Sequence, residues 1–212
     1  MELPDRERVM VLIPCKDRNI DLGCIRGLSQ CLDLFSYQYV FAGSADIALT
    51  RNLGLHHFVE NRPQHDWLMM VDSDIEFDRE DWLKLWEGDE DIVTAEYSKK
   101  LIGSPPARMG LGFTRVHRRV LEKIRDHNYE DGTELAPKFY LDGRCISAYF
   151  TTGPTVQSRW MGEDHSFFMR AAVVDSTYRI ETNTRLRHIG PFAYHYPQQI
   201  PDFASFTGQG AN

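Results

Sequence analysis

Short apolar runs alternate, in the first half of the chain, with longer segments whose apolar residues recur at helical spacing. The runs predict strands that are buried on both faces, and the segments between them predict helices. We expect strands over residues 8–15, 37–42, 66–71 and 91–95, and helices over residues 19–35, 45–60 and 78–86. Such alternation is typical of a mostly parallel sheet with helices on both faces.

The second half has a less regular pattern. We expect a strand over residues 113–116, a helix over 118–127, a hairpin of 139–141 with 145–151, a mobile segment over 153–161, a helix over 162–172, and strands over 176–180 and 186–190. The hairpin turns at Asp142–Gly143, a dipeptide that suits a tight turn. The whole chain therefore predicts one α/β domain, with a central mostly parallel sheet flanked by helices and a smaller mixed sheet.

Composition narrows the function classes. The chain has 212 residues, of which 42% are hydrophobic, and a formal net charge of −7. The negative charge argues against nucleic acid as a partner. No apolar run is long enough to span a membrane, so we expect a soluble, cytoplasmic protein, either complete or one domain of a longer chain. No Cys-x-x-Cys spacing suggests a zinc or redox site among the cysteines, which are Cys15, Cys24, Cys31 and Cys145.

The apolar run at 66–71 ends in Asp72–Ser73–Asp74. Side chains alternate along a strand, so Asp72 and Asp74 point the same way if the extended geometry continues. Two carboxylates at the carboxyl end of a strand favour a site for a divalent cation and a diphosphate. The same three residues are also typical of an ordinary turn. A calcium loop is excluded, because Phe77 and Leu83 stand where that loop needs Gly and Glu.

Two later stretches also have a structural and a functional interpretation. Glu163 and Asp164 begin a predicted helix, where acidic residues complement the helix dipole. One of the two carboxylates could instead act as a general base on an acceptor hydroxyl, or hold a sugar. His188 lies in a predicted strand, and its imidazole is either structural or a ligand that suits Mn²⁺ better than Mg²⁺.

Taken together and in order, these motifs resemble those of the GT-A superfamily of nucleotide-sugar glycosyltransferases, and in particular small members encoded by viruses such as chlorella viruses. The resemblance runs from about Val9 to Gly190. The segments that carry it are Pro14, Ala48–Asn52, Asp72–Ser73–Asp74, Gly110–Phe113, Gly162–Asp164 with Phe167 and Arg170, and His188–Gly190.

The resemblance implies a role for each matched residue. The nucleotide-sugar would be bound by Pro14, Cys15, Asp17, Arg18, Arg51, Asp72, Ser73, Gly110 and Gly112, with Arg51 on the base or diphosphate. The metal, Mn²⁺ or Mg²⁺, would be held by Asp72, Asp74 and His188, with Asp74 as the direct ligand and Asp72 as the bridge to the nucleotide. Asp164, with Glu163, would be the carboxylate near the reacting centre.

The implied activity is a metal-dependent transfer of a hexose from a UDP-sugar to a glycan or glycoprotein hydroxyl. Glucose or a deoxyhexose is expected only because such sugars are common donors, and no residue points to either. Residues 1–206 would form the single domain, with a nucleotide-binding half to about 97, an acceptor half from about 98, and a tail or linker at 207–212. Two alternatives stay open: an aspartyl-phosphate phosphohydrolase using the Asp-x-Asp pair, and a nucleotide-sugar-binding module without catalysis.

Overall fold

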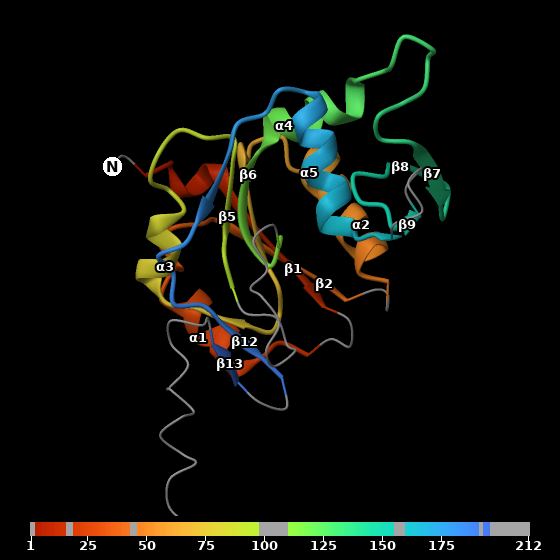
Figure 1. The fold of residues 1–212 in the computed structure, drawn as a ribbon. Coiled ribbons are helices and arrows are strands. Elements are labelled where there is room, and N and C mark those ends of the chain that lie inside the picture. Colours follow the sequence, from red (N-terminus) through yellow and green to blue (C-terminus); the bar gives the residue numbers. More distant parts are fainter. Residues whose placement is uncertain are drawn as a thin grey trace, which may run out of the picture.

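A six-stranded sheet forms the centre of the molecule (Figure 1). The computed structural model describes residues 3–15, 19–42, 46–97, 110–154, 160–190 and 193–195. The strands lie in the order β11-β5-β6-β3-β1-β2. Their bounds are β1 Val9–Cys15, β2 Tyr37–Ala42, β3 Trp67–Val71, β5 Ile92–Ala95, β6 Phe113–His117 and β11 Tyr178–Glu181.

All of these strands run in one direction except β6, which is antiparallel to both β3 and β5. The expected mostly parallel α/β sheet is therefore confirmed. The insertion of β6 between β3 and β5 is the feature that the alternating pattern did not predict. Because β6 runs backwards, its N-terminal end at Phe113 lies beside the C-terminal end of β3 at Val71.

Helices cover both faces of the sheet (Figure 1). One face packs against α1 and α3, and the other against α2, α4 and α5. The helices are α1 Leu22–Ser29, α2 Ile47–Asn61, α3 Arg79–Lys84, α4 Arg118–Asp126 and α5 Glu163–Val173, with a short 3-10 helix at Arg6–Arg8. The two-sided cover explains why the central strands β1 and β3 are uninterrupted apolar runs rather than alternating ones.

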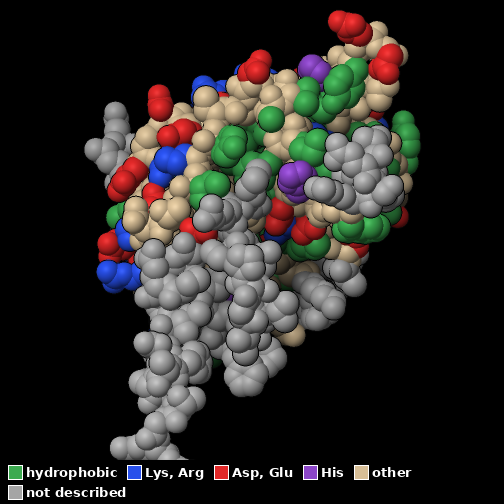
Figure 2. Space-filling view, viewed as in Figure 1, with side chains coloured by type: hydrophobic (Ala, Val, Ile, Leu, Met, Phe, Trp, Pro, Cys, Tyr) green, Lys and Arg blue, Asp and Glu red, His purple; other side chains and the backbone are tan. Residues whose placement is uncertain are grey.

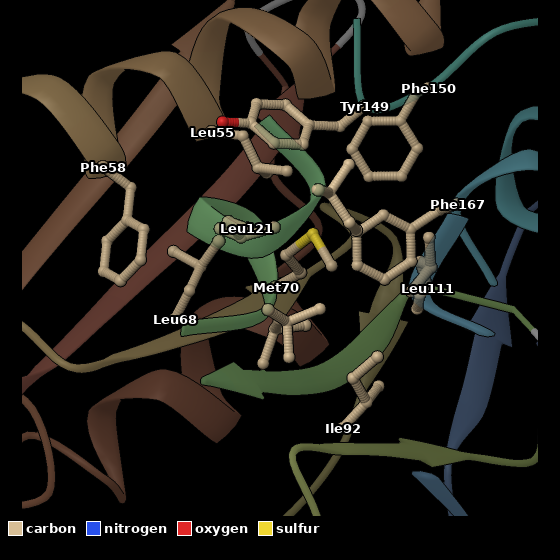
Figure 3. Packing of buried hydrophobic residues seen from close by; sticks show 14 of the residues in the cluster. Leu55, Phe58, Leu68, Met70, Ile92, Leu111, Leu121, Tyr149, Phe150 and Phe167 are labelled. Carbon is tan, nitrogen blue, oxygen red and sulfur yellow. The ribbon is translucent and has the colours of Figure 1, made fainter. Parts of the chain in front are cut away.

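Alternate residues of one strand enter two different cores. In β3, Leu68 and Met70 belong to the cluster beneath α2, α4 and α5, whereas Met69 and Val71 belong to the cluster beneath α1 and α3. Figure 3 shows the first cluster, in which Met70 lies among side chains from helices and loops that are distant in sequence. Each core is thus assembled by the period-two alternation of the strands.

Helix α1 is shorter than predicted at both ends. It begins after Asp21, whose side chain accepts a hydrogen bond from the backbone N–H of Gly23, and it ends at Ser29 rather than at residue 35. Gly23 and Gly27 face β4, and a Cβ on either would come within 2.7 Å of Glu76 or Phe77. The two glycines, which weaken helix propensity, are therefore explained by close packing.

The C-terminal end of α2 is held by a buried arginine at the start of α4. Arg118 donates hydrogen bonds to the backbone carbonyls of Phe58, Val59, Arg62 and His65. These are carbonyls in and just beyond the last turn of α2, and the last turn of a helix has no intrahelical donors for its carbonyls. Arg118 therefore caps α2 from a distance and joins it to α4.

Smaller antiparallel sheets surround the central one. The strands β4 Ile75–Glu76, β12 Arg187–Ile189 and β13 Ala193–His195 form one sheet in the order β13-β12-β4. The expected hairpin is β7 Lys138–Leu141 with β8 Arg144–Ser147, and Asp142 and Gly143 take positive φ values at its turn. β9 Gly153–Pro154 pairs with β10 Trp160–Met161 on either side of residues 155–159, which lie outside the described residues.

Within the described chain, no helix has the length and apolarity needed to cross a membrane.

Candidate functional site

The candidate site lies at the edge of the central sheet where its parallel strands end. Asp72, Ser73 and Asp74 leave β3 in a turn that leads directly into β4. Backbone hydrogen bonds hold this turn on three sides, because Asp72 N–H donates to Gly112 O (2.7 Å), Asp21 N–H to Ser73 O (2.8 Å) and Ile189 N–H to Asp74 O (2.7 Å). Segments from three parts of the chain therefore meet at this turn.

Arg51 is the centre of the site. It lies in the second turn of α2, and its side chain is only 3% exposed. Its Nη2 donates to both carboxylate oxygens of Asp72, at 3.0 and 3.1 Å. Its Nη1 donates to Glu163 at 3.2 Å and to Asp164, the first two residues of α5. One guanidinium thus joins the end of β3 to the start of α5.

Asp74 has a different partner from Asp72. Its Oδ1 lies 3.2 Å from Nε2 of His188, in β12. The imidazole ring of His188 also meets the ring of Tyr97 edge-on, with 5.5 Å between the ring centroids. The two carboxylates of the Asp-x-Asp motif therefore diverge: Asp72 contacts the arginine, and Asp74 contacts the histidine.

Tyr97 lies close to both carboxylate groups of the site, because it contacts His188 and also Gly112, which lies beside Asp72. The hydroxyl of buried Tyr97 accepts a hydrogen bond from Gly112 N–H at 3.2 Å. A Cβ on Gly112 would lie 2.7 Å from Asp72 Oδ2 and 2.8 Å from the Tyr97 hydroxyl, and a Cβ on Gly110 would also meet that hydroxyl. Glycine is therefore required here by Asp72 and Tyr97, independently of any ligand.

Asp164 is electrostatically unlike an ordinary aspartate. Burial raises its pKa to about 6, and the charges of Glu163 and Asp72 act in the same direction. The positive charge of Arg51 and a hydrogen bond with the Leu111 backbone oppose the rise. The Asp164 side chain is 30% exposed to solvent, so a substrate can reach it. A carboxyl group with this pKa can accept and release a proton close to neutral pH.

The other predicted residues are distributed around the same edge. Pro14 and Cys15 end β1, and the side chains of Cys15 and Ser73 share a hydrogen bond. Burial raises the pKa of the Cys15 thiol, so this cysteine is held as a thiol. Asp17 and Arg18 lie outside the described residues. In Figure 2, acidic side chains gather near the middle of the face, close to the N-terminal end of α5.

A divalent cation fits part of this donor set. A carboxylate oxygen beside an imidazole nitrogen, as in Asp74 and His188, is a pair that Mn²⁺ accepts. Both oxygens of Asp72 are engaged by Arg51, and the described His, Cys, Asp and Glu residues form no group of three or more suited to a metal ion. The residues therefore fit a cation held by two protein ligands, with ligand oxygens or water completing its coordination.

Tyr97 and Asn52 belong to the site, although the sequence pattern gives neither of them an individual role. Tyr97 is buried, and it contacts Gly112 and His188. The available signal was its position two residues beyond β5, whose carboxyl end lies at the same sheet edge as that of β3. Asn52 exchanges hydrogen bonds of 2.9 Å with the backbone N–H and carbonyl of Phe150.

Comparisons with known proteins bear on the fold. Neither protein-family models nor curated protein sequences gave a match to the chain. Among solved structures, A197 from STIV matches with a TM-score of 0.56 and 17% identity, over 92% of this chain and 96% of that one. A mutant of Drosophila β1,4-galactosyltransferase 7, in complex with manganese, UDP-Gal and xylobiose, matches with a TM-score of 0.53 and 12% identity, over 95% of this chain and 79% of that one.

The catalytic domain of the same Drosophila enzyme in complex with xylobiose matches with a TM-score of 0.51 and 14% identity, again over 95% and 79% of the two chains. At these identities the likeness concerns the fold alone. The chain therefore has a GT-A-like fold of the kind found in glycosyltransferases.

Proposed function

We propose that this protein is a divalent-metal-dependent glycosyltransferase that transfers a hexose from a UDP-sugar to a hydroxyl group of a glycan or glycoprotein. The observation that carries the proposal is the cluster of Asp72, Glu163 and Asp164 on Arg51, beside the Asp74–His188 pair. Ligands of open α/β sheets bind beyond the carboxyl ends of the strands, which is where this cluster lies.

The donor would bind on the side of Asp74 and His188. Mn²⁺ or Mg²⁺ held there would neutralise the charge that develops on the departing diphosphate. Support comes from the oxygen–nitrogen donor pair, since hard cations of this kind are commonly bound by one or two protein carboxylates together with substrate phosphates. The galactosyltransferase with the similar fold was solved with manganese and UDP-Gal, which is in keeping with this assignment.

The acceptor would bind on the side of α5. Asp164 would take the proton from the acceptor hydroxyl while the acceptor oxygen forms its bond to the anomeric carbon and the bond from that carbon to the diphosphate breaks. The raised pKa of Asp164, about 6, suits a general base that works near neutral pH. Trp160 is 74% exposed and precedes Glu163 by three residues, so it offers a free aromatic face to a sugar ring.

The proposal is tested first by binding. Melting temperatures would be measured with Mn²⁺ alone, with UDP or UDP-sugars alone, and with both. A ligand that binds the folded state raises the melting temperature by mass action. We expect the combination to raise it more than the two separate shifts together. A phosphohydrolase, or a binding module that needs no metal, would show no preference for the pair.

The metal ligand is tested by Asp74→Ala, with Glu80→Ala as the matched control. Glu80 is an exposed acidic residue in the same stretch, paired with Lys84 on α3. We expect Asp74→Ala to abolish the Mn²⁺-dependent part of UDP-sugar affinity in calorimetry, and Glu80→Ala to keep it. Equal affinity of Asp74→Ala and the unmodified protein in the presence of Mn²⁺ would remove Asp74 from the site.

A further inference from the structure

Arg51 has an unusual set of contacts for a residue expected to bind a diphosphate. The whole residue is 2% exposed. Its two terminal nitrogens donate four hydrogen bonds, and every acceptor is a carboxylate oxygen of the protein. Two terminal guanidinium nitrogens carry four N–H groups in total. Both terminal nitrogens of Arg51 therefore face carboxylates of the protein, and Asp72 receives both bonds from Nη2 on its two oxygens, which lie close enough together to share one N–H. The Nε of Arg51 is buried and has no hydrogen-bond partner among the described residues.

The carboxylates that Arg51 holds come from distant parts of the chain. Asp72 is 21 residues away, and Glu163 and Asp164 are 112 and 113 residues away. Three carboxylates around one point repel one another unless a cation lies between them. Arg51 supplies that cation from within the protein, and its planar fork can satisfy acceptors in two directions at once.

The neighbouring residue strengthens the same connection. Asn52 is 4% exposed and makes a reciprocal pair of hydrogen bonds with the Phe150 backbone, in the segment that precedes α5. The Arg51–Asn52 dipeptide thus ties α2 both to the start of α5 and to the chain before it. Two consecutive residues on one helix set the distance between the end of β3 and the carboxylates of α5.

We propose that Arg51 is a positioning residue, which holds Asp164 and Glu163 at a set distance from Asp72, and that it is not a ligand of the donor diphosphate. This inference rests on the proposed function, and it changes the role that the resemblance assigns to Arg51. Through Arg51, the donor side of the site and the acceptor side become one rigid unit, so the base is aligned before either substrate binds.

The test compares Arg51→Lys with Arg118→Lys. Arg118 is the matched control, because it is also buried, lies at the other end of α2, and donates to backbone carbonyls rather than to the site. Lysine keeps the charge but has no fork, so it cannot hold Asp72 and Asp164 together. The measurements are the affinity for UDP with Mn²⁺ by calorimetry, and kcat and donor KM for transfer.

For Arg51→Lys we expect kcat to fall by at least ~10-fold, as for a misaligned general base, while the UDP affinity stays within about 3-fold of the unmodified protein. Arg118→Lys should lower the melting temperature but leave kcat and KM of the folded enzyme unchanged. The inference is overturned if Arg51→Lys keeps kcat and loses UDP affinity, because that result identifies a diphosphate ligand.

A second measurement does not depend on the proposed function. The free energies of unfolding of Arg51→Gln, Asp164→Asn and the double variant form a double-mutant cycle. We expect Asp164→Asn to recover part of the stability lost in Arg51→Gln, because it removes one of the repelling carboxylates. Additive effects would overturn the positioning role. If the unmodified protein binds no nucleotide, the proposed function fails, and this cycle still decides whether Arg51 holds Asp164.

Discussion

A buried arginine lies at each end of helix α2: Arg51 belongs to α2 itself, and Arg118 belongs to α4. The two arginines have different kinds of partner. Near the start of α2, Arg51 donates to the side chains of Asp72, Glu163 and Asp164. At its end, Arg118 donates to four backbone carbonyls. Among the described residues, the carboxylate paired with Arg118 is that of Glu122, which lies 3.8 Å away and whose side chain is 43% exposed. Both guanidinium groups are buried, but only that of Arg51 is surrounded by several carboxylates.

The pKa values of Arg51 and Arg118 shift in opposite directions, in keeping with their different partners. Burial alone would lower the pKa of Arg51, but the charges of Asp72 and Asp164 outweigh it and raise the pKa above its usual range. Burial lowers the pKa of Arg118, and the charge of Glu122 opposes this only in part. Carbonyl dipoles satisfy hydrogen bonds without balancing a charge, whereas carboxylates do both.

The difference separates a structural cap from a site. A buried arginine on carbonyls repairs the open end of a helix, which any fold requires. A buried arginine on three carboxylates maintains a group of like charges that folding alone does not need, since apolar residues of similar size would often be no less stable. The start of α2 is therefore where function is expected, and its end is where stability is expected.

The largest expected effect is a loss of stability on substitution of Arg118, at the C-terminal end of α2. Arg118→Met would leave carbonyls of Phe58, Val59, Arg62 and His65 without their donor. At roughly 1–3 kcal/mol for each buried group left unsatisfied, and with water replacing part of the loss, we expect a decrease of about 3 kcal/mol in the free energy of unfolding. Denaturant titration measures it. Transfer activity per folded molecule should not change, and a loss of both together would contradict the division of roles.

The next effect should come from the functional end. Asp164→Asn should leave donor binding close to that of the unmodified protein and reduce transfer by at least ~10²-fold, the low end for a lost acid–base group. Because the pKa of Asp164 is raised, its ionisation at neutral pH works against folding, and the neutral asparagine should be at least as stable. Kinetics and denaturation of the same sample test both statements. Turnover equal to that of the unmodified protein would exclude Asp164 from the mechanism.

The smallest expected effect is a dependence of transfer on pH, which should come from Asp164 at the Arg51 end of α2 and not from the Arg118 end. With a pKa of about 6, Asp164 is deprotonated above that pH, so transfer should rise with pH through 6 and be about tenfold lower at pH 5 than at its plateau. The folded protein binds this proton more tightly than the unfolded chain does. The stability that this group contributes is therefore complete below pH 3.8 and is lost as pH rises through about 6.

Two variants sharpen the pH measurement. Asp164→Asn should lose the rise in transfer through pH 6, whereas Arg118→Met should keep it, because Arg118 does not contact the carboxylates of the site. A flat profile between pH 5 and pH 7 in the unmodified protein would show that no group with this pKa limits transfer.

Much of the fold could be predicted because its signals are local. The strands β1 and β3 are continuous apolar runs, and both are buried where they were expected. The hairpin turn at Asp142–Gly143 was also predictable, because both residues take the positive φ values that this dipeptide tolerates. Helix α1 was predicted too long, because apolar spacing continues beyond the residues that Asp21 and the glycines allow to be helical.

Tertiary structure decided the order of the strands. β6 is buried like its neighbours although it contains Thr114 and Arg115, and nothing in its sequence pattern indicates that it enters between β3 and β5 in the opposite direction. That placement brings Gly112 beside Asp72 and leaves room for Tyr97. Strand order depends on contacts between residues far apart in the chain, which periodicity does not encode.

The candidate site divides in the same way. The sequence identified Asp72, Asp74, Glu163, Asp164 and His188 as candidates from local features, namely carboxylates at strand and helix ends and a histidine in a late strand, and Arg51 was implied by the family resemblance. Only the folded chain shows the protein partner of each carboxylate, which is Arg51 for Asp72 and His188 for Asp74. The reason is physical: chemistry resides in side-chain types, which the sequence states, whereas the partner of each charge is set by which buried segments pack together.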